Sequence, residues 1–251
     1  TGKGSGLAVG NQTNNTNTKD HVTVKLQDVI LDGFGGNAVV FSSWGKLVAQ
    51  NVTFSNNRCA STQGRGAAIG FSGAGTLLAD NCKFTNNSLA NGYGGAVYMD
   101  NAAGRIAITN CEFTKNKAPN GGGAFYLRAH AITLQGNRFA GNSTNGYGGA
   151  GYLVSSTNDE KAESSNNYGS YDAVLQNNTF ENNTAYSQGG AIYMNPSAIT
   201  VTTLLDQCTF TNNSTTTGGG SAVYHNQGSL TLGTGNLFED NKSYGGASGM
   251  Y

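Results

Sequence analysis

The sequence predicts an all-β fold, a right-handed parallel β-helix of about eight rungs. Two observations predict it: a pair of motifs that recurs along most of the chain, and short apolar runs with β-type alternation between the turns. The composition agrees, since Gly takes 38 of 251 positions while Pro takes only 2. This glycine share is typical of a fold with many tight turns, because glycine adopts positive φ at no steric cost.

The first motif is Phe-x-x-Asn, which occurs seven times at intervals of 26 to 41 residues. Because equivalent positions of successive rungs lie about 4.8 Å apart, we expect the Phe side chains to stack as a column inside the solenoid. The Asn is expected at a turn, where stacked amides bond to one another and to turn backbone. The seven copies are Phe54 with Asn57, Phe84 with Asn87, Phe113 with Asn116, Phe139 with Asn142, Phe180 with Asn183, Phe210 with Asn213, and Phe238 with Asn241.

The second motif is a glycine pair followed by a small and an apolar residue. We expect the pair to permit a bend that a Cβ would obstruct. A unit of about thirty residues with two or three short strands cannot bury a face alone, whereas stacked units can. The pairs assigned to this role are Gly94–Gly95, Gly122–Gly123, Gly148–Gly149, Gly189–Gly190 and Gly219–Gly220.

The strand after each glycine pair separates two faces. In "AVYMD", Val97 and Met99 share one face, and Tyr98 lies on the other. Aliphatic residues dominate the first face, so we place it inside. The opposite face then carries a row of Tyr that is a candidate binding surface, because Tyr offers apolar area with a polar tip. The alternatives are that the Tyr only shield the sheet, or that the two faces are inverted. The row consists of Tyr98, Tyr126, Tyr152, Tyr193 and Tyr224.

The repeat divides the chain into two parts. Residues 47–251 hold the seven units, and residues 1–46 are expected to form an N-terminal rung or cap. One interval between Phe residues is longer than the others, and we interpret residues 155–172 as a loop inserted there. The loop is a second candidate binding site, because loops on rigid scaffolds often carry recognition. Its acidic candidates are Asp159, Glu160 and Glu163.

The charged residues predict no chemistry. Lys plus Arg and Asp plus Glu are 14 each, so the formal net charge is zero, and we expect no nucleic-acid partner. Catalytic β-helices need carboxylates clustered on adjacent rungs, whereas the acids here are scattered and the three His lie far apart. We therefore predict that the chain is not an enzyme and has no catalytic residues, no metal site and no cofactor.

Two cysteines occupy the same repeat position. Cys82 and Cys111 each lie two residues before a motif Phe, on adjacent rungs. They are either small buried residues in a column or the two halves of a disulfide, since about 4.8 Å between Cα atoms is within the range that a disulfide allows.

The paired motifs resemble the repeats of chlamydial polymorphic membrane proteins. The segments "NNSLANGYGGAVYM" and "ENNTAYSQGGAIYM" fit closely, and the resemblance covers about residues 47–251. The clusters Gly66-Ala67-Ala68 and Gly219-Gly220-Ser221-Ala222 and the insert depart from it. The resemblance implies the secreted β-helical passenger of an autotransporter, displayed at the cell surface as a virulence-associated adhesin that attaches to a host-cell protein or glycan. In that family a C-terminal barrel makes the outer-membrane contact. We expect membrane contact only through such a barrel, which is absent from this chain.

Two other functions remain open. The rods could self-associate end to end through exposed rung edges and build a fibre or coat, in which case their length in solution would grow with concentration. The chain could also be a β-helix that binds or cleaves polysaccharide, and release of reducing ends from a glycan panel would reveal cleavage.

Overall fold

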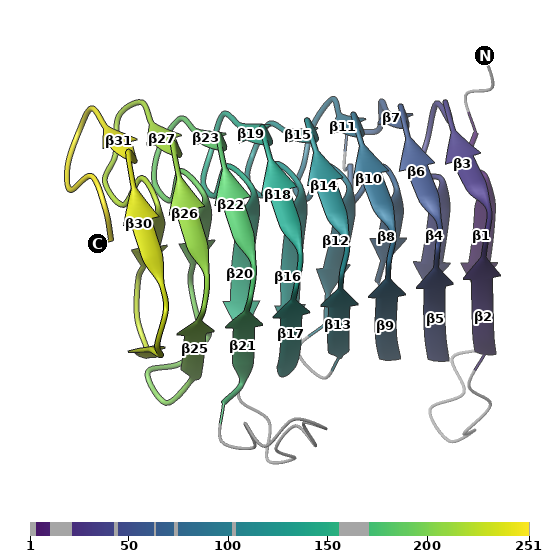
Figure 1. Cartoon of the computed structure of the whole chain (residues 1–251). Coiled ribbons are helices and arrows are strands. Elements are labelled where there is room, and N and C mark those ends of the chain that lie inside the picture. The colour runs from purple at the N-terminus through teal and green to yellow at the C-terminus, as the bar shows by residue number, and fades with distance from the viewer. Residues whose placement is uncertain are drawn as a thin grey trace.

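The computed structural model describes residues 4–10, 22–42, 45–62, 64–72, 75–101, 104–155 and 171–250. Within these ranges the regular elements are β-strands, which stack as parallel sheets along one axis (Figure 1). The predicted all-β solenoid is therefore confirmed. This part of the chain contains no helix with the length and apolar character that a membrane crossing requires.

Four sheets form the walls, and a complete coil takes one strand from each, whereas the first described coil has strands in sheets A, B and C alone. Sheet A contains β1 (Leu7–Gly10), β4 (Val39–Ser42), β8 (Ile69–Phe71), β12 (Val97–Asp100), β16 (Phe125–Ala129), β20 (Gly151–Ser155), β24 (Ile192–Met194) and β28 (Val223–His225). Sheet B contains β2 (Val22–Gln27), β5 (Gly45–Gln50), β9 (Gly75–Asp80), β13 (Arg105–Thr109), β17 (Ala131–Gln135), β21 (Ala173–Gln176), β25 (Thr202–Asp206) and β29 (Ser229–Leu232).

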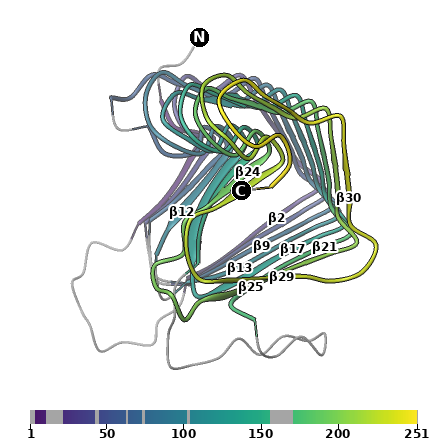
Figure 2. The same cartoon turned by 90° about the vertical axis from the view of Figure 1, so that its left-hand side faces the viewer.

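Sheets C and D complete each coil. Sheet C contains β3 (Ile30–Asp32), β6 (Thr53–Ser55), β10 (Lys83–Thr85), β14 (Glu112–Thr114), β18 (Arg138–Ala140), β22 (Thr179–Glu181), β26 (Thr209–Thr211) and β30 (Leu237–Glu239). Sheet D contains β7 (Arg58–Cys59), β11 (Ser88–Leu89), β15 (Lys117–Ala118), β19 (Ser143–Thr144), β23 (Thr184–Ala185), β27 (Ser214–Thr215) and β31 (Lys242–Ser243). Viewed along the axis, the coils superpose closely (Figure 2).

The register continues into the N-terminal part. Strands β1, β2 and β3 pair with β4, β5 and β6, so they form a coil of the same solenoid. The division drawn between residues 46 and 47 falls inside β5, and sheet B runs across it. Most of the expected insert, residues 156–170, lies outside the described residues.

Asparagine makes the two tight corners between sheets B, C and D. Corner residues with positive φ recur once per coil, a conformation that Asn adopts more readily than most residues. Between sheets B and C they include Asn51, Asn81, Asn110 and Asn177, with φ of 50° to 56°. Between sheets C and D they include Asn56, Asn86, Asn182 and Asn212, with φ of 54° to 56°. The Asn-rich composition is thus a consequence of the corners.

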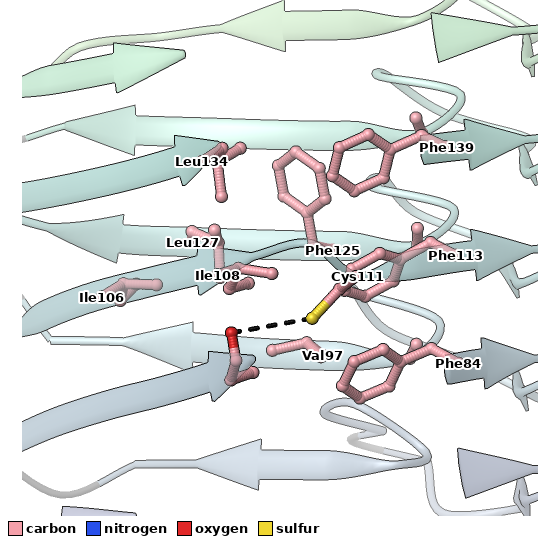
Figure 3. Packing of buried hydrophobic residues seen from close by; sticks show 14 of the residues in the cluster. Phe84, Val97, Ile106, Ile108, Cys111, Phe113, Phe125, Leu127, Leu134 and Phe139 are labelled. Atoms are coloured by element: carbon pink, nitrogen blue, oxygen red, sulfur yellow. Dashed lines mark hydrogen bonds between the residues drawn. The ribbon is translucent and has the colours of Figure 1, made fainter. Parts of the chain in front are cut away.

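The motif Phe residues stack inside the solenoid as predicted. Figure 3 shows Phe84, Phe113 and Phe139 one above another from β10, β14 and β18. Their centroids are 4.4 Å and 5.0 Å apart, and all three side chains are fully buried. A fully buried aromatic ring contributes about 3 kcal/mol relative to an exposed one, so this column is a main source of stability.

The motif Asn residues form a buried ladder. Asn116 shows the pattern: its Nδ2 donates to Asn142 Oδ1 at 3.0 Å and to the Phe84 carbonyl at 2.8 Å. Its Oδ1 accepts from the backbone N–H of Asn87 at 3.0 Å. Each amide therefore satisfies backbone groups at a corner that buries them, as predicted from the motif.

The cysteines are buried free thiols. The backbone N–H of Cys82 donates to Cys111 Sγ at 3.3 Å, and Cys111 N–H donates to Asn137 Oδ1 at 2.9 Å. Cys111 Sγ also lies 3.6 Å from the Ala79 carbonyl (Figure 3). The neighbouring Cys82 thiol, together with burial, raises the pKa of the Cys111 thiol, although the Cys82 backbone N–H acts in the opposite direction. Of the two interpretations of this pair, the structure shows small buried residues in a column.

The two glycines of each pair have different roles. Gly122 is needed for its backbone conformation, since its φ is 61°. Gly123 is needed because no side chain fits at its position: a Cβ there would lie 2.1 Å from the Gly149 carbonyl oxygen. The pair assigned to Gly219–Gly220 is displaced by one residue. Gly220, with a φ of 63°, takes the first position, and Ser221 takes the second, where its buried hydroxyl donates to the Ser248 carbonyl.

Candidate binding surface

The predicted Tyr row forms on the outer face of sheet A. Strand register places its five members directly opposite one another on adjacent coils, while the alternate residues Val97 and Met99 join the core. The assignment of faces is therefore confirmed, and the inverted alternative is wrong. Successive ring centroids lie 5.1, 5.1, 4.9 and 5.3 Å apart from Tyr98 to Tyr224.

The row is less exposed than its outer position suggests. Tyr98 and Tyr193 are only 6% and 9% exposed, and the other three rings are partly exposed. Burial raises the pKa of Tyr126 and of Tyr193 to about 12, and it raises the pKa of Tyr98 and Tyr152 as well. These phenols are therefore neutral hydrogen-bonding groups at physiological pH.

A second layer covers the row. The segments that connect sheet D back to sheet A, here called the D–A connections, comprise the described residues 60–62 and 64–68, 90–96, 119–124, 145–150, 186–191 and 216–222. Arg65, Tyr93, Gly121 and Tyr147 hold equivalent positions in four of them and are linked by isolated β-bridges. The Arg65 guanidinium lies 5.5 Å from the Tyr98 ring centroid, and Tyr93 lies 5.2 Å from Tyr126.

Two Tyr of this covering layer were missed by reasoning on the sequence. Tyr93 and Tyr147 join the row through ring contacts, which makes one connected cluster of seven Tyr. Both rings remain 37% and 39% exposed, respectively. The signal was available, since "NGYGGA" occurs twice, at residues 91–96 and 145–150, with Tyr just before the glycine pair.

Charged groups lie at the Tyr98 end of the row, whereas neutral polar groups lie near its middle, beside Tyr152. At its Tyr98 end, the phenol donates to Asp100 Oδ2 at 2.9 Å, and Asp100 pairs with Arg128. Beside Tyr152 the neighbours are amides: Asn195 Nδ2 lies 3.4 Å from the Tyr152 hydroxyl, and Asn226 Nδ2 donates to Asn195 Oδ1 at 2.8 Å. The surface therefore combines aromatic rings with neutral hydrogen-bonding groups in its central part.

The second candidate site falls outside the described residues. Asp159, Glu160 and Glu163 all lie in the undescribed stretch 156–170, so their role as binding residues stays a prediction. Within the described ranges, no three His, Cys, Asp or Glu side chains gather in a way that would hold a metal ion.

One family matches the chain. The family described as right handed beta helix region covers residues 95–249, which is more than half of the chain. The protein belongs to this family. Right-handed β-helices include both enzymes and non-enzymes, so membership establishes the fold and its handedness and leaves the activity to the surface residues. Neither the curated proteins nor the solved structures contain a match to this right-handed β-helix.

Proposed function

We propose that this β-helix is a non-catalytic adhesin domain, displayed outside the cell as the passenger of an autotransporter similar to the chlamydial polymorphic membrane proteins. The motifs supply the resemblance to that family. The observation that carries the binding role is the connected cluster of seven Tyr on the outer face of a stiff solenoid. Aromatic side chains held in place by a rigid scaffold lose little entropy on binding, so they suit recognition.

The repeat provides a mechanism of attachment. A solenoid presents equivalent positions at a regular spacing along its length, so a host-cell protein or glycan with several binding groups can contact several coils at once. Weak contacts of this kind add through effective concentration. The interior Phe column and Asn ladder serve this function by keeping the coils in register.

Binding to intact cells tests the proposal. Labelled protein would be measured on cells by flow cytometry, beside a variant in which residues 155–172 are replaced by a short Gly-Ser link and circular dichroism confirms folding. We expect saturable binding by the unmodified chain. Binding that survives the replacement directs attention to the Tyr cluster, and binding that disappears directs it to the loop.

Two outcomes would contradict the proposal. Absence of cell binding by both proteins, with rods that lengthen as concentration rises, would favour the structural rod that self-associates. Release of reducing ends from a polysaccharide panel would show cleavage and overturn the non-catalytic part.

A further inference from the structure

The covering layer is shifted by one coil relative to the Tyr row. Three D–A connections each place a side chain over the ring of the following coil: Arg65 over Tyr98 at 5.5 Å, Tyr93 over Tyr126 at 5.2 Å, and Tyr147 over Tyr193 at 4.9 Å. By the same shift of one coil, Gly121 is the residue that lies over Tyr152. Since glycine has no side chain, the layer is interrupted at this one coil of the series.

At this interruption the ring of Tyr152 is oriented differently from the rings on either side of it. Its plane is turned by 61° from Tyr126 and by 76° from Tyr193, whereas the pairs at the two ends of the row stack at 13° and 12°. A Cβ added to Gly121 would lie 2.8 Å from Tyr152 Cδ1, so this ring has moved toward the position that a covering side chain would take. Tyr152 therefore lies at the middle of the cluster, and its ring orientation departs from that of its neighbours.

Two rings flank this centre almost symmetrically. The centroids of Tyr93 and Tyr147 lie 6.1 and 6.4 Å from that of Tyr152, with interplanar angles of 75° and 72°. They come from coils on either side of Gly121, so their backbones are about 10 Å apart along the axis. Both are more exposed than the rings they cover, so ring surface is available on both sides of Tyr152.

The local charge favours a neutral ligand. Burial raises the pKa of Tyr152, the Asn195 amide lowers it, and Tyr93 and Tyr147 raise it, with no charged side chain of the described residues among these causes. The charged groups lie toward the other end: Asp100 and Arg65 shift the pKa of Tyr98 in opposite directions, and Asp100 and Arg128 do the same for Tyr126. Because Asp100 and Arg128 already pair with each other, the surface around Tyr152 favours a neutral ligand.

The kind of exposed apolar surface favours a sugar over a peptide. Among the described residues, large exposed aliphatic side chains lie on the terminal coils or near residue 199, as with Ile30, Leu237 and Ile199. Beside Tyr152 the exposed apolar surface is mainly aromatic, with the partly exposed Val154 on the same strand, and the polar partners are phenols and the Asn195 amide. A pyranose ring has an apolar C–H face and a rim of hydroxyls, which matches Tyr rings bordered by neutral hydrogen-bonding groups.

We propose that Tyr93, Tyr147 and Tyr152 form a binding site for a neutral oligosaccharide that lies along the solenoid axis. Sugar rings stack on Tyr93 and Tyr147, and the Asn195 amide and the Tyr152 hydroxyl bind sugar hydroxyls between them. Gly121 makes the site by leaving this coil uncovered. The biological setting, a glycan on another cell, rests on the proposed adhesin function, whereas the site itself rests on the geometry.

Affinity measurements with soluble sugars test the site. The probes are neutral hexasaccharides built from glucose, galactose or N-acetylglucosamine, with sulfated and sialylated oligosaccharides as charged counterparts. Titration calorimetry would compare the unmodified chain with Tyr93→Ala/Tyr147→Ala. The matched control is Tyr186→Ala/Tyr244→Ala, which removes two exposed Tyr, at 52% and 79%, from outside the cluster.

We expect at least one neutral hexasaccharide to bind, with affinity lowered at least about tenfold in the cluster variant and unchanged in the control, as for removal of aromatic stacking partners elsewhere. Tyr93→Phe/Tyr147→Phe should keep most of the affinity, because the rings remain. Saturation-transfer NMR should show the sugar C–H protons closest to the protein aromatic protons. Equal affinity of the cluster variant and the control, or binding of charged sugars alone, would overturn the proposal.

Periodate treatment of the cells separates this inference from the adhesin function. Cell binding that falls after periodate oxidation of surface sugars, and falls likewise in the cluster variant, supports both. Cell binding unaffected by either change would leave the adhesin function standing and overturn the glycan site. Binding of soluble neutral sugar without any cell binding would support the site and contradict the adhesin function.

Discussion

The interior Phe column and the outer Tyr row both place one aromatic ring per coil, over seven coils and five coils respectively, yet the rings behave differently. Along the Phe column, from Phe54 to Phe238, neighbouring rings are parallel within 4° to 22°. Along the Tyr row the interplanar angles run from 12° to 76°. The difference lies in their surroundings, since strand register is the same for both.

The Phe rings are packed between one another inside the core, and the widest angle of the column, 22°, lies at Phe139, where the Phe125 ring also packs at 5.2 Å. Each Tyr is covered by a residue that changes from coil to coil, from Arg65 to Tyr93, Gly121 and Tyr147. Repetition therefore builds the scaffold, and departure from repetition builds a distinct site. This is the usual division in repeat proteins, where variable positions lie on the binding face.

The largest effect should follow from opening the Phe column. Phe113→Ala should lower the free energy of unfolding by about 4 kcal/mol, because it leaves a cavity between two fully buried rings. Tyr152→Ala on the partly exposed row should cost less than half as much. Urea denaturation monitored by circular dichroism measures both losses. Equal losses would show that the outer Tyr row stabilises the fold as much as the buried Phe column.

The Asn ladder should come next. Asn116→Ala leaves the Phe84 carbonyl and the Asn87 N–H without their side-chain partner in a buried corner, and we expect a loss of about 3 kcal/mol. Asn86→Gly is the control, because Asn86 bonds only at the outer surface and glycine also adopts its φ of 55°. The same denaturation assay should find the control within about 1 kcal/mol of the unmodified chain. If Asn86→Gly lowered the free energy of unfolding as much as Asn116→Ala, the outer amides would stabilise the fold as much as the buried ladder does.

Alkaline pH should distinguish the two aromatic arrays, because only the Tyr row titrates. Burial raises the pKa of Tyr126 and Tyr193 to about 12 in the folded chain, against about 10 when unfolded. A raised pKa in the folded state favours the neutral phenol, so this contribution is complete below about pH 10 and is lost as pH rises through about 12.

The measurement is the free energy of unfolding against pH, recorded with the tyrosinate absorbance. Tyr126→Phe/Tyr193→Phe should show a shallower decline over this range than the unmodified chain. Identical slopes would show that these two phenols do not carry the pH dependence.

The smallest effect should come from the outer face of sheet C. Arg138 lies between Glu112 and Glu181 on three successive coils, with its side chain 49% exposed. Arg138→Ala should change the free energy of unfolding by less than about 1 kcal/mol, and less still in high salt, because exposed ion pairs are screened. A larger loss at both salt concentrations would show that charge ladders outside the core also hold the coils together.

The sequence by itself determined the scaffold. The spacing of Phe and Asn predicted the interior column and the amide ladder, and the alternation around Tyr98 predicted which face of sheet A is buried. These features were readable because strand alternation and stacking act on local sequence and recur in every coil. The same regularity identified Cys82 and Cys111 as neighbours.

Only the tertiary structure decided how the outer face is covered. The D–A connections fold back over sheet A with a shift of one coil, so Tyr93 meets Tyr126 and Gly121 meets Tyr152, residues that are about one repeat apart in sequence. The sequence already showed Gly219-Gly220-Ser221-Ala222 as a departure from the repeat, but only the structure decided that Gly220 takes the first position of the pair. Neither follows from periodicity, because periodicity states which residues are equivalent and leaves open which connection packs on which coil.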